Sequence, residues 1–266
     1  SWWLWAAACA ALVAFTPVQS HAQRRAPSSF AAAAVERSLA VDAAGNYYAA
    51  AHGYGACFMN GDLYRYDGNA WVSIAAGLGN TNVNELALNP LGGQLYAGTD
   101  GGVFRYDPNG WTALNAGLPD TGVHRIAFGP NGDLWAATNA GVALLSANNS
   151  SWTVLNNGLN GLPVHAFAID EDPAHMIISC GYSIEQSGSL YARLYESNDS
   201  GNNWSPIAPN MESTVINHLA FTGNNTCFAL GWGIFRSTDK GQSWYAANNG
   251  FSARTFNTQG RMAVSA

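Results

Sequence analysis

A repeat of roughly 40 residues runs through most of the 266-residue chain and constrains its fold more than any other feature of the sequence. The tryptophans that follow a polar turn are Trp71, Trp111, Trp152, Trp204 and Trp244. The alanines inside a short apolar triplet are Ala40, Ala87, Ala127, Ala168, Ala220 and Ala263. Both series are spaced by 40 to 52 residues, so two independent markers share one period.

Each repeat contains four short strand-like segments. In one unit these segments read IAF, DLWAAT, GVALLS and SWTVL, and turn-forming sequences such as GPNG separate the first two. Four strands in roughly 40–45 residues is the period of a β-propeller blade. A two-sheet sandwich has no reason to repeat at this period, and the 3.6-residue apolar pattern of helical repeats is absent. The sequence therefore predicts an all-β fold, a β-propeller of four-stranded antiparallel blades.

The repeat also predicts the domain organisation. The propeller covers 37–266, and its five complete blades are about 37–75, 84–115, 124–156, 165–208 and 217–248. From about 262 the sequence RMAVSA restarts a first strand, as the beginning of a sixth blade. We therefore expect a fragment of a ring of about six to eight blades. A closed ring of five blades is the alternative.

The N-terminal segment has the character of an export signal. Residues 1–22 are apolar through Phe15 and then polar, with the small residues Ser20 and Ala22 before a cleavage position. Residues 23–36 are then a linker. We expect an exported, periplasmic or secreted protein with no membrane span beyond this signal segment. Lipoprotein processing at Cys9 is less favoured, and a buried N-terminal helix is the structural alternative.

Composition excludes some functions. Charged residues make up 11% of the chain, the net charge is −6, and there is no run of Lys or Arg, so binding to nucleic acid is disfavoured. Beyond the signal segment the cysteines are Cys57, Cys180 and Cys227, which form neither a disulfide framework nor a CxxC metal site. Two arrangements of these three cysteines remain open: one disulfide with a spare thiol, or three buried thiols. No cofactor is expected.

Two turns share one pattern, SNDSGNNW (197–204) and STDKGQSW (237–244). The carboxylates of Asp199 and Asp239 can accept hydrogen bonds from nearby backbone N–H groups and close the turn between the third and fourth strands. The other structural positions are the glycines and tryptophans of the turns. Gly201 and Gly241 can adopt positive φ, and Trp204 and Trp244 can bury their rings between blades. Other blades keep degraded versions of the turn, so we interpret it as scaffold rather than active site.

These residues also carry a family resemblance. The segment GLPDTGVHRIAFGPNGDLWAATNAGVALLS (117–146) resembles the two-component-regulator propeller repeat, and the two turns resemble the Asp-box, or BNR, motif. The resemblance covers 37–266 and implies a propeller of the kind found in sialidases, xyloglucanases, sortilin-type receptors, photosystem assembly factors and sensor ectodomains. It implies a fold rather than a single function.

The resemblance makes glycoside hydrolysis the competing function. A sialidase would need an arginine triad, a Tyr/Glu nucleophile pair and an acidic Asp, but Arg65, Arg105 and Arg236 occupy one repeat position and no nucleophile pair stands out. A xyloglucanase-type pair of aspartates would face each other across a cleft. The candidates Asp42 and Asp170 follow first strands and resemble turn residues. Whether the chain is an enzyme is therefore left open, with a non-catalytic role favoured.

The polar residues at the start of the first strands vary from blade to blade. They are Asn84, Glu85, His124, Arg125, His165, Asn217 and His218. First strands open toward the central mouth of a propeller, so we expect these residues at one rim, where ligands commonly bind. Three histidines at one rim also invite a metal hypothesis, but hydrogen-bonded strand ends account for them better, so no metal site is assigned.

Two insertions, 52–61 and 179–189, fall between second and third strands and so lie on the same face. Each offers a tyrosine, Tyr54 or Tyr182, that could stack on a sugar or a partner side chain, although drift in loop length explains them equally well. The predicted function is an exported, non-catalytic binding module for a protein or a carbohydrate. A glycoside hydrolase, or a structural, assembly or sensor ectodomain of a longer protein, are the alternatives.

Overall fold

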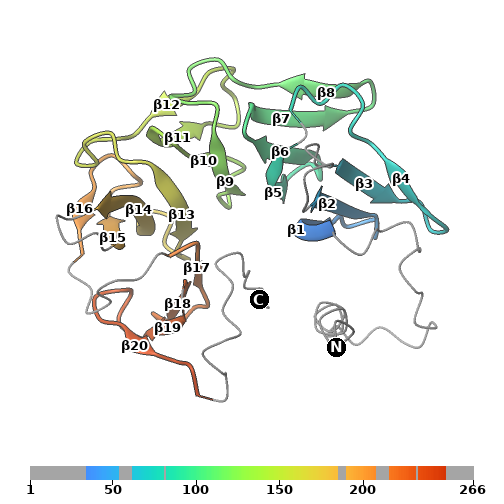
Figure 1. Ribbon diagram of the computed structural model, residues 1–266. Helices are drawn as coiled ribbons and strands as arrows, with labels where there is room; N and C mark the ends of the chain where they lie inside the picture. Colours follow the sequence, from blue (N-terminus) through green and yellow to red (C-terminus); the bar gives the residue numbers. More distant parts are fainter. Residues whose placement is uncertain are drawn as a thin grey trace.

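The computed structural model describes residues 34–53, 62–80, 82–184, 190–207, 216–231 and 233–249. Within them the chain forms five antiparallel sheets of four strands each, joined in chain order. Figure 1 shows these sheets as successive blades of an arc, with the first strand of each blade on the inner side. The all-β, four-stranded blade architecture predicted from the repeat is confirmed.

The strands of each blade follow one another along the chain. Blade 1 is β1 (Ala34–Val41), β2 (Tyr47–Gly53), β3 (Asp62–Tyr66) and β4 (Trp71–Ser73). Blade 2 is β5 (Val83–Leu88), β6 (Leu95–Thr99), β7 (Gly102–Asp107) and β8 (Gly110–Ala113). Blade 3 is β9 (Val123–Phe128), β10 (Leu134–Thr138), β11 (Gly141–Leu145) and β12 (Thr153–Val154). Blade 4 is β13 (Val164–Ile169), β14 (Met176–Ile184), β15 (Leu190–Ser197) and β16 (Ser205–Pro206). Blade 5 is β17 (His218–Phe221), β18 (Cys227–Leu230), β19 (Ile234–Ser237) and β20 (Tyr245–Ala246).

Two segments differ from the expectation. Strand β1 begins at Ala34, inside the predicted linker 23–36, because its backbone pairs with β2 as far as Gly53. The blade 4 insertion is largely strand rather than loop, because β14 continues to Ile184 and pairs there with Leu190 of β15. The signal segment 1–22, Cys57 and the partial blade from 262 lie outside the described residues.

The core of the molecule lies between blades rather than inside a single sheet. All five residues of β6 and all five of β10 are buried, because both faces of an inner strand pack against neighbouring blades. Four apolar clusters occupy the four junctions between successive blades in the described part of the chain. Two of them contain the buried free thiols of Cys180 and Cys227. Fully burying one large apolar side chain contributes about 1.5–3 kcal/mol, so these junctions hold the arc together.

Tryptophans add a polar link across three of these junctions. The indole Nε1 of Trp111 donates to the carbonyl oxygen of Ile74 at 2.7 Å, and that of Trp204 donates to Leu155 at 2.8 Å. Trp152 makes the same contact with the carbonyl oxygen of Leu114. Each bond joins a blade to the residue that follows the last strand of the preceding blade. The periodic tryptophan therefore ties one repeat to the next.

The face of blade 1 that points away from blade 2, here called its outward face, is more exposed than the equivalent faces of the following blades. Leu39, Val41 and Tyr47 are 43%, 47% and 43% exposed. At the same repeat positions in blade 2, Leu86 and Leu95 are only 6% and 2% exposed because blade 1 covers them. In Figure 1 the arc is open on this side of β1. The number of blades in the complete ring stays a prediction.

Candidate functional site

The first strands of blades 2 to 4 share a β-bulge one residue after a buried opening valine. The bulged residues are Asn84, His124 and His165. A bulge takes one residue out of the strand pairing and redirects its side chain, and bulges are frequent beside functional sites. The sequence reasoning selected these residues for their polarity but missed the bulge. The available signal was the break in apolar–polar alternation at VNEL, VHRI and VHAF.

Arg125 links two other predicted rim residues, Glu85 and Asn217. Its Nη1 donates to Glu85 Oε2 at 2.9 Å, and its Nη2 donates to the carbonyl oxygen of Asn217 at 2.7 Å. The hydroxyl of Ser38 donates to Glu85 Oε1 at 3.2 Å and accepts from the backbone N–H of Leu86 at 2.9 Å. The side chains of Arg125 and Glu85 are 17% and 15% exposed. The network thus joins the first strands of blades 1, 2 and 3 to the residue just before the first strand of blade 5.

The two histidines of blades 3 and 4 lie against each other. The rings of His124 and His165 have centroids 4.6 Å apart, and His124 Nε2 lies 2.9 Å from Asn139 Oδ1. Burial lowers the pKa of His124. Burial, followed by the nearby His124 and Arg125, lowers the pKa of His165 to about 4. Both imidazoles are therefore neutral at pH 7, and they can offer donor and acceptor nitrogens without charge.

The remaining rim residues make other contacts or are only partly described. Asn84 is buried at 8% exposure and donates to Asp100 Oδ1 at 2.7 Å and to the carbonyl oxygen of Val123 at 2.9 Å, so it ties blade 2 to blade 3. His218 begins β17 and is half-buried. Tyr54 lies outside the described residues, as does the side chain of Tyr182, whose backbone pairs with Ala192.

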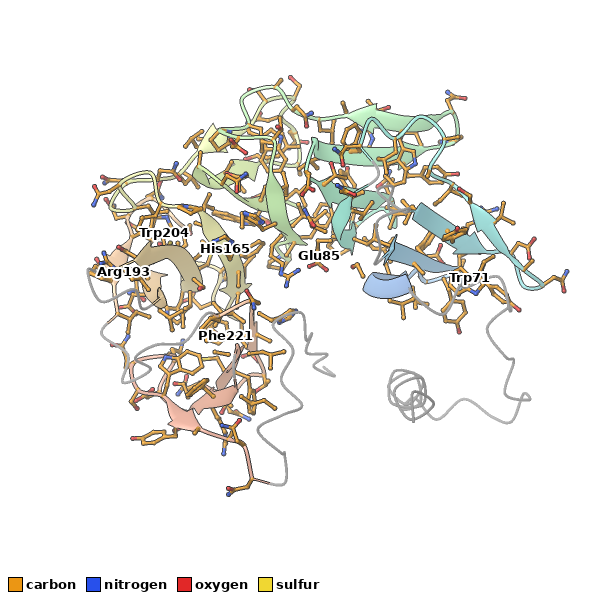
Figure 2. All side chains as sticks on the ribbon, in the orientation of Figure 1. Trp71, Glu85, His165, Arg193, Trp204 and Phe221 are labelled. Carbon is orange, nitrogen blue, oxygen red and sulfur yellow. The ribbon has the colours of Figure 1, made fainter. Side chains whose placement is uncertain are left out.

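Figure 2 shows the radial order of these positions. Glu85 and His165 are on the inner strands, whereas Trp71 and Trp204 lie farther out on their blades. Glu85 and His165 thus lie toward the inner edge of the arc, and ligand binding at this rim stays a prediction. Ser38, Asp100 and Asn139 make hydrogen bonds to predicted rim residues, and the sequence reasoning had not selected these three.

The Asp-box turn of blade 5 satisfies its own carboxylate. Asp239 Oδ1 accepts from the Ser237 hydroxyl at 2.7 Å and from the Ser243 N–H at 2.9 Å, and Oδ2 accepts from the Ser243 hydroxyl. These bonds, those from Ser243 above all, lower the pKa of Asp239 to about 2. Gly241 supplies a φ of 90°, and Trp244 is 1% exposed. The corresponding residues of the blade 4 turn are Asp199, Ser197, Asn203, Gly201 and Trp204.

The residues considered for hydrolysis are distributed over separate blades. Arg65, Arg105 and Arg236 lie on β3, β7 and β19. Arg105 pairs with Asp107 of its own strand at 3.0 Å. Asp42 accepts four hydrogen bonds from within its own turn and the strand that follows. Asp170 behaves differently, because it binds Lys240 of the next blade at 2.8 Å.

Two further findings concern metal binding and membrane spans in the described part of the chain. No three His, Cys, Asp or Glu side chains within it are arranged to hold a metal ion. Nor does that part contain a helix long and apolar enough to cross a membrane.

Solved structures of similar fold have diverse functions. The GH74 xyloglucanase from Xanthomonas campestris matches with a TM-score of 0.59 and 18% identity, over 80% of this chain and 38% of the enzyme. YCF48 bound to D1 peptide matches with a TM-score of 0.56 and 15% identity, over 81% of this chain and 68% of that protein. The extracellular domain of the putative hybrid two component system BT4673 from B. thetaiotaomicron matches with a TM-score of 0.54 and 16% identity, over 80% and 33%. At these identities the likeness shows the fold alone.

Sequence comparison is more specific about the family. No curated protein matches the chain. A family model does match residues 23–265, nearly the whole chain. The chain belongs to the DUF6242 β-propeller domain family.

Proposed function

We propose that this propeller is a binding module that receives a protein or a carbohydrate at the rim formed by its first strands. The observation that carries the proposal is the Arg125 network. One guanidinium links Glu85 of β5 to the backbone of Asn217 at the entry of β17, so polar groups from widely separated repeats converge at the inner edge. Rigid strands that present several polar groups to one point are typical of ligand sites on propellers.

The chemistry of the rim favours binding over hydrolysis. Glycoside hydrolysis needs two carboxyl groups flanking the scissile bond, one of them free to attack or to activate water. Glu85 is instead engaged by both Arg125 and Ser38. The neutral imidazoles of His124 and His165 can exchange hydrogen bonds with hydroxyl or amide groups of a ligand. A carbohydrate or a peptide supplies such groups.

The similar structures support both ligand classes. One neighbour is a xyloglucanase, and another is YCF48 with a bound peptide. A further neighbour is an extracellular domain, in keeping with the predicted export of this chain to the periplasm or beyond. A role as the sensor or assembly ectodomain of a longer protein is compatible with a binding rim, since such ectodomains also recognise ligands.

The test is binding by the full chain to a glycan array and to immobilised peptides, before and after the double substitution His124→Ala/Arg125→Ala. We expect a loss of at least about tenfold in affinity, typical of removing a central polar anchor. Thr153→Ala, on the exposed outer strand of the same blade, is the matched control and should bind normally. Thermal melting of each variant separates lost binding from lost folding. Turnover of chromogenic glycosides by the wild-type chain would overturn the proposal.

A further inference from the structure

Three hydrogen-bonded side chains lie in a row at the entry of blade 3, and the row ends at His124. Asn139 Nδ2 donates to Asp120 Oδ1 at 3.1 Å, and Asn139 Oδ1 lies 2.9 Å from His124 Nε2. The backbone N–H of Gly122 donates to the same Asp120 oxygen at 2.7 Å, and the backbone N–H of Asn139 donates to the carbonyl oxygen of Gly122 at 3.0 Å. Asp120 and Asn139 are therefore both anchored to the turn that leads into β9.

The side-chain amide of Asn139 has one orientation that satisfies its neighbours. A carboxylate only accepts hydrogen bonds, so the amide atom that faces Asp120 is the nitrogen. Turning the amide over would place two acceptor oxygens against each other. Position 122 adds a steric requirement, because a Cβ atom there would lie 2.0 Å from Asn139 Nδ2. Glycine at 122 thus leaves room for the amide, and the amide oxygen faces His124.

The orientation of Asn139 fixes where His124 carries its proton. The amide oxygen only accepts, so His124 Nε2 is the donor of this hydrogen bond. Burial lowers the pKa of His124 from its ordinary value of 6.5, so at pH 8 the ring is neutral and Nδ1 holds a lone pair. Nδ1 accepts no hydrogen bond from the described residues, and this atom is not fully buried. It is therefore available to a donor from outside.

Blade 2 has the same arrangement with no ambiguity about the donor. Asn84, the bulged residue at the position of His124, donates from Nδ2 to Asp100 Oδ1 at 2.7 Å. Asp100 follows β6 as Asn139 follows β10. In blade 4 the position equivalent by its backbone hydrogen bond is Gly181, which has no side-chain acceptor. Among blades 2 to 4, blade 3 alone combines this hydrogen bond with a histidine.

We propose that Asp120 and Asn139 are positioning residues that hold His124 in the Nε2–H tautomer, so that the rim presents Nδ1 as an uncharged hydrogen-bond acceptor. This inference rests on the proposed binding function and adds a rule of specificity to it. The ligand atom that meets His124 is a hydrogen-bond donor, either a hydroxyl of a carbohydrate or an N–H of a peptide. A carbonyl, ether or carboxylate oxygen is disfavoured there, because it would place its lone pairs against that of Nδ1.

The tautomer is measured directly by NMR on the full chain at pH 8. Long-range ¹H–¹⁵N correlation with ¹⁵N-labelled histidine distinguishes the protonated from the bare ring nitrogen. The chain contains six histidines, and the signals of His124 are those that His124→Gln removes. We expect a protonated Nε2 and a bare Nδ1. A proton on Nδ1, or an even mixture of the two tautomers, would overturn the proposal.

Variants show whether the neighbours set this tautomer. Asn139→Leu removes the acceptor, and Asp120→Ala lets the amide turn over, so each should give a mixture of tautomers. Asn139→Asp keeps an acceptor beside Nε2 and should keep the Nε2–H form. Asn80→Ala is the matched control, because Asn80 Oδ1 accepts the equivalent turn bond in blade 2, from the N–H of Asn82 at 2.9 Å. An unchanged tautomer in folded Asn139→Leu and Asp120→Ala would mean that both residues are merely structural.

Binding to the glycan array and the immobilised peptides gives the second readout. Asn139→Leu should weaken binding by about tenfold, Asn139→Asp should retain more of it, and Asn80→Ala should bind normally. Binding confined to glycans would identify the donor as a hydroxyl, and binding confined to peptides would identify it as an N–H. Undiminished binding by folded Asn139→Leu would overturn the role of Nδ1. If the wild-type chain binds to neither surface, the proposed function is contradicted, whereas the tautomer is still decided by NMR.

Discussion

Arg125 Nη2 donates to the carbonyl oxygen of Asn217 at 2.7 Å, although 92 residues separate them in the sequence. This bond joins the entry of β9 to the entry of β17, past the blade that lies between them in chain order. It shows that the inner edge of the arc is a connected polar structure rather than a row of independent strand ends.

The first prediction concerns the stability of this structure. Arg125→Leu should lower the free energy of unfolding by about 1–3 kcal/mol, because it leaves the largely buried Glu85 carboxylate without its charged donor. Urea denaturation measures the change. Adding Glu85→Gln to the variant should recover part of the loss, since the buried charge is then absent. If the double variant is no more stable than Arg125→Leu, the ion pair is not the cause.

The second prediction concerns the Asp-box turn. Asp239→Ala removes the acceptor for Ser237 and Ser243, so we expect a stability loss of about 1 kcal/mol, modest because the turn is exposed. Rim binding should be unchanged once the variant is folded. A variant with wild-type stability that had lost rim binding would contradict the scaffold role.

The period of the sequence was sufficient to predict the blades. Strand alternation and turn residues are local signals, and they repeat often enough to place five four-stranded sheets. The start of β1 at Ala34 and the extension of β14 to Ile184 were missed, because pairing with a partner strand continued beyond the local pattern.

The candidate sites were predicted less completely, because they depend on contacts between blades. A pattern identified His124 and Arg125 as rim residues, but it could not show which carboxylate or carbonyl each would reach. Asp170, likewise, binds Lys240 of the next blade, a variable position of a repeated turn. Such positions look interchangeable in sequence, and only the packing of adjacent blades distinguishes them.

The third prediction is a pH dependence. Burial holds the pKa of His165 at about 4, below its ordinary value of 6.5. Between these values the unfolded chain binds a proton that the folded chain does not, so stability should fall as the pH is lowered through this window. The loss should be about 1–2 kcal/mol, allowing for solvent screening of a half-buried group. His165→Gln should flatten the profile of urea midpoints between those pH values. Superimposable wild-type and variant profiles would contradict the assignment.

The fourth prediction concerns the exposed outward face of blade 1. In blade 2, the residues at the positions of Leu39 and Tyr47 are covered by blade 1. We therefore expect a further blade to cover this face of blade 1 in a complete ring. A cysteine placed at Leu39 tests this, because Leu39 and Val72 have similar exposure here, 43% and 46%, but Val72 lies on the outer strand β4. Maleimide should label Val72→Cys quickly in either case.

If a further blade packs on this face in the native protein, Leu39→Cys should react at least about tenfold more slowly than Val72→Cys, since a buried thiol is shielded from the reagent. The background is favourable, because burial raises the pKa of both Cys180 and Cys227 to about 12 and so suppresses their thiolates. Labelling of the unmodified chain supplies the remaining baseline. Equal rates at the two introduced cysteines would mean that the face stays open, and they would contradict closure of the ring over blade 1.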